Sequence, residues 1–124
     1  MERVTGIGGF FFVARDPDSL ARWYAEHLGV DAPPQNYGDP SWRQDSGSTV
    51  FAPMDATAPH FAEASSGWAL NFRVADLDAM VDQLRAAGVA VVVDPEVYPN
   101  GRFASLSDPE GNGIELWQPE GDDA

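Results

Sequence analysis

Apolar residues along the first part of this chain change from a continuous run to a helical spacing. Gly6 to Ala14 is apolar at almost every position and too short for a membrane helix, which predicts a strand covered on both faces. Asp16 can then cap a helix whose first position is Pro17, and Gly29 can end it. The apolar stripe of this predicted helix consists of Leu20, Trp23, Tyr24, His27 and Leu28.

The same order of features recurs in the second half of the chain. Trp68 to Val74 predicts a strand, Asp76 caps a second predicted helix, and Gly88 is placed to end it. An internal repeat of this kind predicts two copies of one structural unit. We place the first unit at about 4–60 and the second at about 66–119, followed by an acidic tail over 120–124.

Each unit also carries β-rich runs after its helix. In the first unit these runs are 41–46 and 48–53, on either side of a glycine, and the connection that follows is rich in proline. In the second unit they are 89–93, 103–107 and 114–117. The expected fold class is therefore α+β, with two tandem βαβββ modules in a single domain, each module a curved, mostly antiparallel sheet with one helix.

The last two runs predict a hairpin with an unusual carboxylate. Asp108 to Gly113 is rich in turn formers, and the residues that follow alternate, so that Ile114 and Leu116 share one face of a strand. Glu115 and Trp117 share the other face. A carboxylate between large apolar residues in a strand is costly without a partner, which makes Glu115 the main candidate for function.

This hairpin, with its DPEGN turn and the following IELW, resembles the C-terminal hairpin of the vicinal oxygen chelate superfamily, which includes glyoxalase I, extradiol dioxygenases and bleomycin-resistance proteins. The resemblance implies two modules that face each other around a cavity, paired in a homodimer. It also implies a metal-ligand role for Glu115. The other three ligand positions of metal-using members fall on Gly9, Phe51 and Ala69, whose side chains cannot bind a metal.

One carboxylate is too few protein ligands for a catalytic Zn²⁺, Ni²⁺ or Fe²⁺ site. We therefore expect no metal cofactor, while an atypical divalent-metal site stays open as the alternative. Gly6 to Gly9 lacks the spacing of a dinucleotide fingerprint and precedes its strand, so a nucleotide cofactor is not expected either.

The net negative charge of the chain disfavours some classes of binding partner. The chain has seven Lys and Arg residues against twenty Asp and Glu, a net charge of −13 that opposes binding to nucleic acid or to an anionic membrane. It contains no cysteine, which excludes disulfides and a thiol nucleophile. No apolar run approaches the length of a membrane span, and we expect a cytoplasmic protein.

Alternation also predicts which residues line the cavity. Asn71 and Arg73 share the polar face of their strand, and we expect Arg73 to pair with Glu115, because a buried carboxylate needs a cation or stays protonated. His27 is expected to be structural, and His60 to be solvated unless its loop covers the cavity mouth. The predicted ligand-binding residues are Phe11, Phe51, Asn71, Arg73, Phe103, Glu115 and Trp117.

Three functions are compatible with these features. The resemblance favours a metal-independent protein that binds a drug or natural product, as in the bleomycin-resistance branch. The alternative is a lyase, isomerase or dioxygenase of the same superfamily, either with an atypical metal site or with Glu115 as acid or base. A partner-binding module without a small-molecule ligand is the third, and no motif in the sequence points to it.

Overall fold

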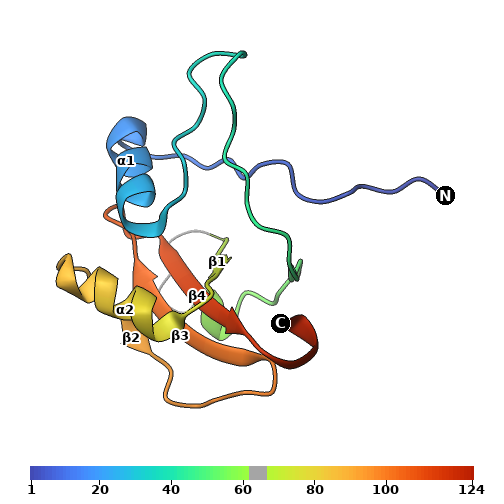
Figure 1. Ribbon diagram of the computed structural model, residues 1–124, viewed down its shortest axis with the longest axis vertical. Helices are drawn as coiled ribbons and strands as arrows, with labels where there is room; N and C mark the ends of the chain where they lie inside the picture. The colour runs from blue at the N-terminus through green and yellow to red at the C-terminus, as the bar shows by residue number, and fades with distance from the viewer. Residues whose placement is uncertain (62–66) are drawn as a thin grey trace.

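The computed structural model describes residues 1–61 and 67–124, and it shows an α+β chain with one curved four-stranded sheet (Figure 1). The order of strands across the sheet is β1-β4-β3-β2. The elements, in chain order, are α1 (Pro17–Leu28), η1 (Pro59–Phe61), β1 (Leu70–Arg73), α2 (Leu77–Ala86), β2 (Val92–Val93), β3 (Gly101–Ser107), β4 (Gly113–Pro119) and η2 (Gly121–Asp123), where η denotes a 3₁₀-helix.

The second half of the chain contains the strand, helix and three strands that its pattern predicts. β3 and β4 form the predicted antiparallel hairpin, and β2 extends it on one side. β1 pairs in parallel with β4, with Asn71 opposite Glu115. A parallel pair needs a long crossover between its strands, and here α2 and the hairpin provide it.

Both predicted helices are confirmed, together with their caps. The Asp16 side chain accepts a hydrogen bond from the Ser19 N–H at the start of α1, and Gly29 ends that helix in the left-handed region at φ 71°. Asp76 accepts the equivalent bond from the Ala79 N–H at the start of α2. Short-range signals of this kind depend only on neighbouring residues, which is why the sequence predicts them well.

The hydrophobic core lies between α2, part of α1 and one face of the sheet. α2 contributes its apolar stripe, and the hairpin contributes the residues that alternate toward the helix. Leu77, Leu84 and Leu116 are completely enclosed. The other buried members of this core are Leu20, Tyr24, Val81, Val91, Ala104, Leu106 and Ile114.

The DPEGN turn attaches α1 to the hairpin. The buried Asp108 carboxylate accepts a hydrogen bond of 2.7 Å from the Tyr24 hydroxyl. Burial, together with this carboxylate, raises the pKa of Tyr24 well above its ordinary value. Glu110 accepts hydrogen bonds from the backbone N–H groups of Arg15 and Asp16 at 2.7 Å and 3.1 Å. The turn therefore closes the hairpin and also fixes the start of the first helix.

The strands predicted in the first half of the chain are wrong for the single chain that the structure describes. The ranges 6–14, 41–46 and 48–53 are extended but form no strand, and the N-terminal segment projects from the body of the molecule (Figure 1). Phe11 is 94% exposed, where both faces of its strand were expected to be covered. A strand needs a partner for its backbone groups, and the four strands of the sheet pair only with one another.

Candidate functional site

The face of the sheet away from α2 carries the polar and aromatic residues that alternation predicts. Strand register arranges them in two rows that run across the sheet. The polar row contains Asn71, Glu115 and Ser105, and the aromatic row contains Arg73, Trp117 and Phe103. We call this surface the open face.

Glu115 lies at the centre of the polar row and has two polar neighbours. The Asn71 side-chain amide donates a hydrogen bond of 2.7 Å to Glu115 Oε1. The Nε2 atom of His60, which is carried by η1, lies 3.8 Å from the same oxygen. The Glu115 and His60 side chains are 30% and 40% exposed, so a small molecule can approach both of them.

The expected Arg73–Glu115 ion pair is wrong. Glu115 lies opposite Asn71 in the parallel pair of β1 and β4, whereas Arg73 lies opposite Trp117. Its guanidinium instead donates a hydrogen bond of 2.9 Å to the Asp45 carbonyl. A side chain at Gly47 would collide with this guanidinium, so the glycine permits the close approach.

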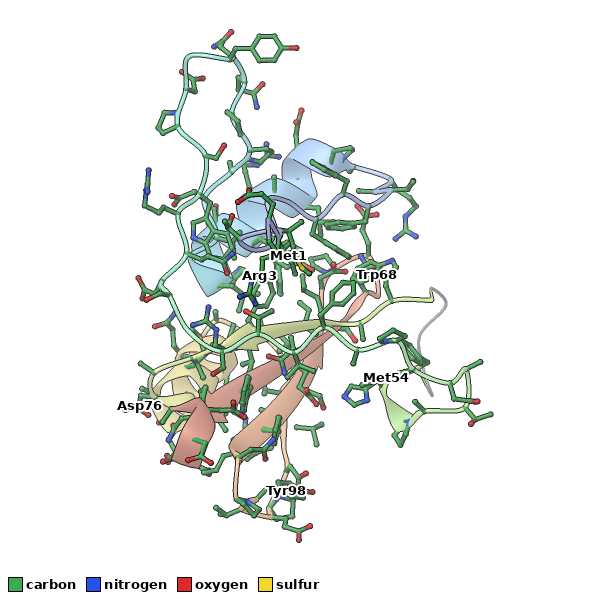
Figure 2. The ribbon with its side chains drawn as sticks, turned by 90° about the vertical axis from the view of Figure 1, so that its right-hand side faces the viewer. Met1, Arg3, Met54, Trp68, Asp76 and Tyr98 are labelled. Carbon is green, nitrogen blue, oxygen red and sulfur yellow. The ribbon has the colours of Figure 1, made fainter. Side chains whose placement is uncertain are left out.

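The Arg73–Asp45 contact joins the open face to the extended segment that crosses the sheet on the side away from α2. Figure 2 shows this segment passing in front of the sheet toward Met54 and η1. The same segment therefore leads to His60. The first half of the chain thus contributes one polar side chain to the Glu115 site.

Trp117 is a fixed aromatic ring beside Glu115, and it is only 3% exposed in the single chain. Its ring lies parallel to that of Phe103, with the ring centroids 6.2 Å apart, and its indole N–H donates a hydrogen bond of 2.8 Å to the Asn100 carbonyl. Tyr98 packs edge-on against Phe103. The Tyr98 hydroxyl donates to Asp94, which raises the pKa of Tyr98 to about 12. Tyr98 is therefore a neutral phenol near pH 7.

Two of the predicted ligand-binding residues are not brought to this site. Phe11 and Phe51 are 94% and 84% exposed, and both lie on extended segments. The structure also brings in His60, which remains 40% exposed and for which the sequence had left open a loop position at the site. No periodic signal could have placed His60, because it lies in an irregular segment and reaches Glu115 only through the tertiary fold.

The residues at the open face do not fit a metal cofactor. Among the described residues, no group of three or more His, Cys, Asp and Glu side chains converges on one point. Glu115 and His60 alone are one ligand short of the usual three protein ligands of a catalytic zinc site. We therefore derive no reaction step that passes through a metal ion.

The two grooves found on the surface lie elsewhere. A groove of about 360 Å³ runs between α1 and the hairpin turn, with Arg15, Trp23 and Glu110 among its lining residues. A second, of about 400 Å³, lies beside Pro40 to Gln44. Neither of these two grooves is lined by Glu115, so both lie away from the polar residues of the sheet.

Comparison with known families and structures supports this picture of the fold. Residues 9–117 match the profile of the glyoxalase-like domain family. TnmS3, an antibiotic binding protein from Streptomyces sp. CB03234, is 24% identical with a TM-score of 0.63, and the match covers 97% of this chain and 100% of that one. A glyoxylase/bleomycin resistance protein/dioxygenase domain from Frankia sp. EAN1pec is 22% identical with a TM-score of 0.61, covering 95% and 100%.

A third solved structure, the oxidase ChaP-H2, is 25% identical with a TM-score of 0.52, and the match covers 90% of this chain and 91% of that one. No curated protein matches this sequence. In the described part of the chain, no helix is both long enough and apolar enough to cross a membrane.

Proposed function

Because this chain belongs to the glyoxalase-like domain family, we propose that it binds a small, flat natural product or drug on its open face without a metal ion. The observation that carries the proposal is Glu115, an accessible carboxylate beside the parallel rings of Phe103 and Trp117. Among the described residues it lacks the further ligands that a catalytic metal needs. Binding sites of this kind combine apolar walls with a few placed polar groups. The antibiotic-binding function in the name of TnmS3 supports the same reading.

We also infer that a second copy of the chain completes the site. Most of the exposed large apolar residues belong to residues 1–54, and unpartnered apolar area of this kind marks an interaction surface. β1 and β2 are the free edges of the sheet, and extended segments of a partner could pair with them. In such a dimer Phe11 and Phe51 of the partner copy would form the walls that the single chain lacks.

The dimer has a direct test. We expect light scattering coupled to gel filtration to give twice the chain mass, and the double variant Phe11→Asp/Phe51→Asp to give the monomer mass. The matched control is Val97→Asp, which replaces another exposed apolar residue in the second half of the chain and should leave the dimer intact. A monomeric wild-type protein would contradict the inference.

The binding function is tested with a defined panel of compounds. Bleomycin and planar aromatic antibiotics are titrated by calorimetry and by tryptophan fluorescence, with and without EDTA. We expect at least one compound to bind with a stoichiometry of one per chain and an affinity that EDTA does not change. Trp117→Phe should remove most of the fluorescence response, although the chain contains four tryptophans. Binding that requires added metal would contradict the proposal.

An enzyme is the second candidate, and one observation favours it. No Arg or Lys pairs with Glu115 in the described residues, and His60 lies 3.8 Å away, so this carboxylate could transfer a proton. The oxidase among the structural neighbours makes such chemistry plausible for the fold. Turnover of a bound compound that Glu115→Gln abolishes, with binding retained, would support this alternative. The cytoplasmic location expected from the sequence stays a prediction.

A further inference from the structure

We propose that His60 and Glu115 together recognise a hydrogen-bond donor and an adjacent acceptor on one neutral, planar ligand group, such as a primary amide or a hydroxyl beside a carbonyl. Glu115 would accept from the ligand, and His60 would donate to it through Nε2. This inference rests on the proposed function, because it names the chemistry that the open face selects.

The spacing of the two side chains allows one ligand group that lies alongside them to contact both. Nε2 of His60 and Oε1 of Glu115 are 3.8 Å apart, which is too long for a direct hydrogen bond. Asn71 already donates to Oε1, which fixes the orientation of the carboxylate. Oε2 of Glu115 accepts no hydrogen bond from any described residue, so nothing among these residues competes with a ligand donor for it.

His60 is held by a turn that is formed from local hydrogen bonds. The Asp55 carboxylate accepts from the Thr57 N–H at 2.9 Å and from the Thr57 hydroxyl at 2.7 Å. The Ala58 N–H donates to the Asp55 carbonyl, and the Phe61 N–H donates to the Ala58 carbonyl. The hydrogen bonds from Thr57 lower the pKa of Asp55, so the turn keeps its charged acceptor near neutral pH. A preformed turn loses little entropy when a ligand binds.

Charge and the pair of polar atoms together favour a neutral ligand group. An anion would be repelled by the Glu115 carboxylate and by a protein with a net charge of −13. A cation would be attracted by the same charge, but it would offer no acceptor to Nε2 of His60. A planar amide or hydroxy-carbonyl group satisfies the acceptor and the donor together, and its ring can lie beside the aromatic row that contains Trp117.

The test compares two probes with the same ring. 2-Naphthamide offers a donor and an acceptor, whereas methyl 2-naphthoate offers only an acceptor. Calorimetry and ligand-observed NMR should show the amide binding wild-type protein about tenfold more tightly, since a hydrogen bond to a charged group has roughly that effect. His60→Phe keeps a flat ring but removes the donor that the acceptor of both probes uses, so it should weaken the binding of both probes by a similar factor and leave the preference for the amide. His27→Phe, at the other histidine, is the matched control and should change neither affinity.

Each outcome decides between the two proposals. Equal binding of amide and ester to wild-type protein would overturn the pairing of His60 with Glu115 while leaving a flat-ligand site intact. Binding of neither probe would overturn the pairing, and the antibiotic panel would then decide the proposed function separately. Unchanged affinities in His60→Phe, or weakened affinities in His27→Phe, would also contradict the pairing. Circular dichroism and melting temperature confirm that each variant folds.

Discussion

The two halves of this chain have similar apolar patterns but differ in structure. The second half forms a helix and a four-stranded sheet around enclosed leucines such as Leu77 and Leu116. The first half forms one helix and long extended segments, on which Phe11 and Val13 are almost fully exposed. The difference shows that an apolar run specifies a strand only where another strand is available to pair with it.

The helix of the first half is ordered for a different reason than its extended segments. α1 satisfies its own backbone groups, and the hairpin of the second half holds it through Asp108 and Glu110. The extended segments have side-chain contacts but form no ladder with the sheet: the rings of Phe10 and Phe12 pack against Trp68, and the Asp45 carbonyl accepts from Arg73. The first half is therefore attached to the second through α1 and through these few side-chain contacts.

The largest effect expected from this comparison is a loss of stability on substitution of a core residue in the second half. Leu116→Ala should lower the free energy of unfolding by about 2–5 kcal/mol, because it leaves a cavity at a completely enclosed position. In the monomeric variant Phe11→Asp/Phe51→Asp, the further change Val13→Ala, at a position that is 97% exposed in the single chain, should change it by less than about 0.5 kcal/mol. Urea unfolding followed by circular dichroism measures both. A comparable loss in Val13→Ala would show that the first half is also packed in solution.

A smaller effect is expected where the halves join. Tyr24→Phe removes the hydroxyl that donates to the buried Asp108 carboxylate, and should cost about 1–3 kcal/mol because that group loses a partner. Tyr37→Phe is the matched control, since Tyr37 is fully exposed. The same unfolding experiment measures both variants. If Tyr24→Phe is neutral, the hairpin does not hold α1 through this bond.

The smallest effect expected is a decrease in the free energy of unfolding at alkaline pH. The raised pKa of Tyr24 means that the unfolded chain loses its phenol proton first, at about the ordinary value of 10.0. Stability is therefore complete below pH 10 and should decline as pH rises above it, by at most about 1.4 kcal/mol per pH unit from this group. Tyr24→Phe should have a shallower decline. Identical pH profiles for the two proteins would contradict the assignment.

Alternation along β1, β3 and β4 was sufficient to place Asn71, Phe103, Glu115 and Trp117 on one face, because side chains in a strand point alternately to its two sides. Their role in binding a ligand stays a prediction. Alternation could not say which residues face one another across strands. That is why the expected partner of Glu115 was Arg73, whereas the register gives it Asn71.

Local sequence was enough to predict the two helices with their caps, the final hairpin and the position of Glu115 between two apolar residues of its last strand. These features depend on residue type and on neighbours within a few positions. The strand register and the position of His60 beside Glu115 became known only from the tertiary structure. The same holds for the absence of strands in the described part of the first half. Each of these depends on contacts between residues far apart in the chain, and local propensity carries no information about such contacts.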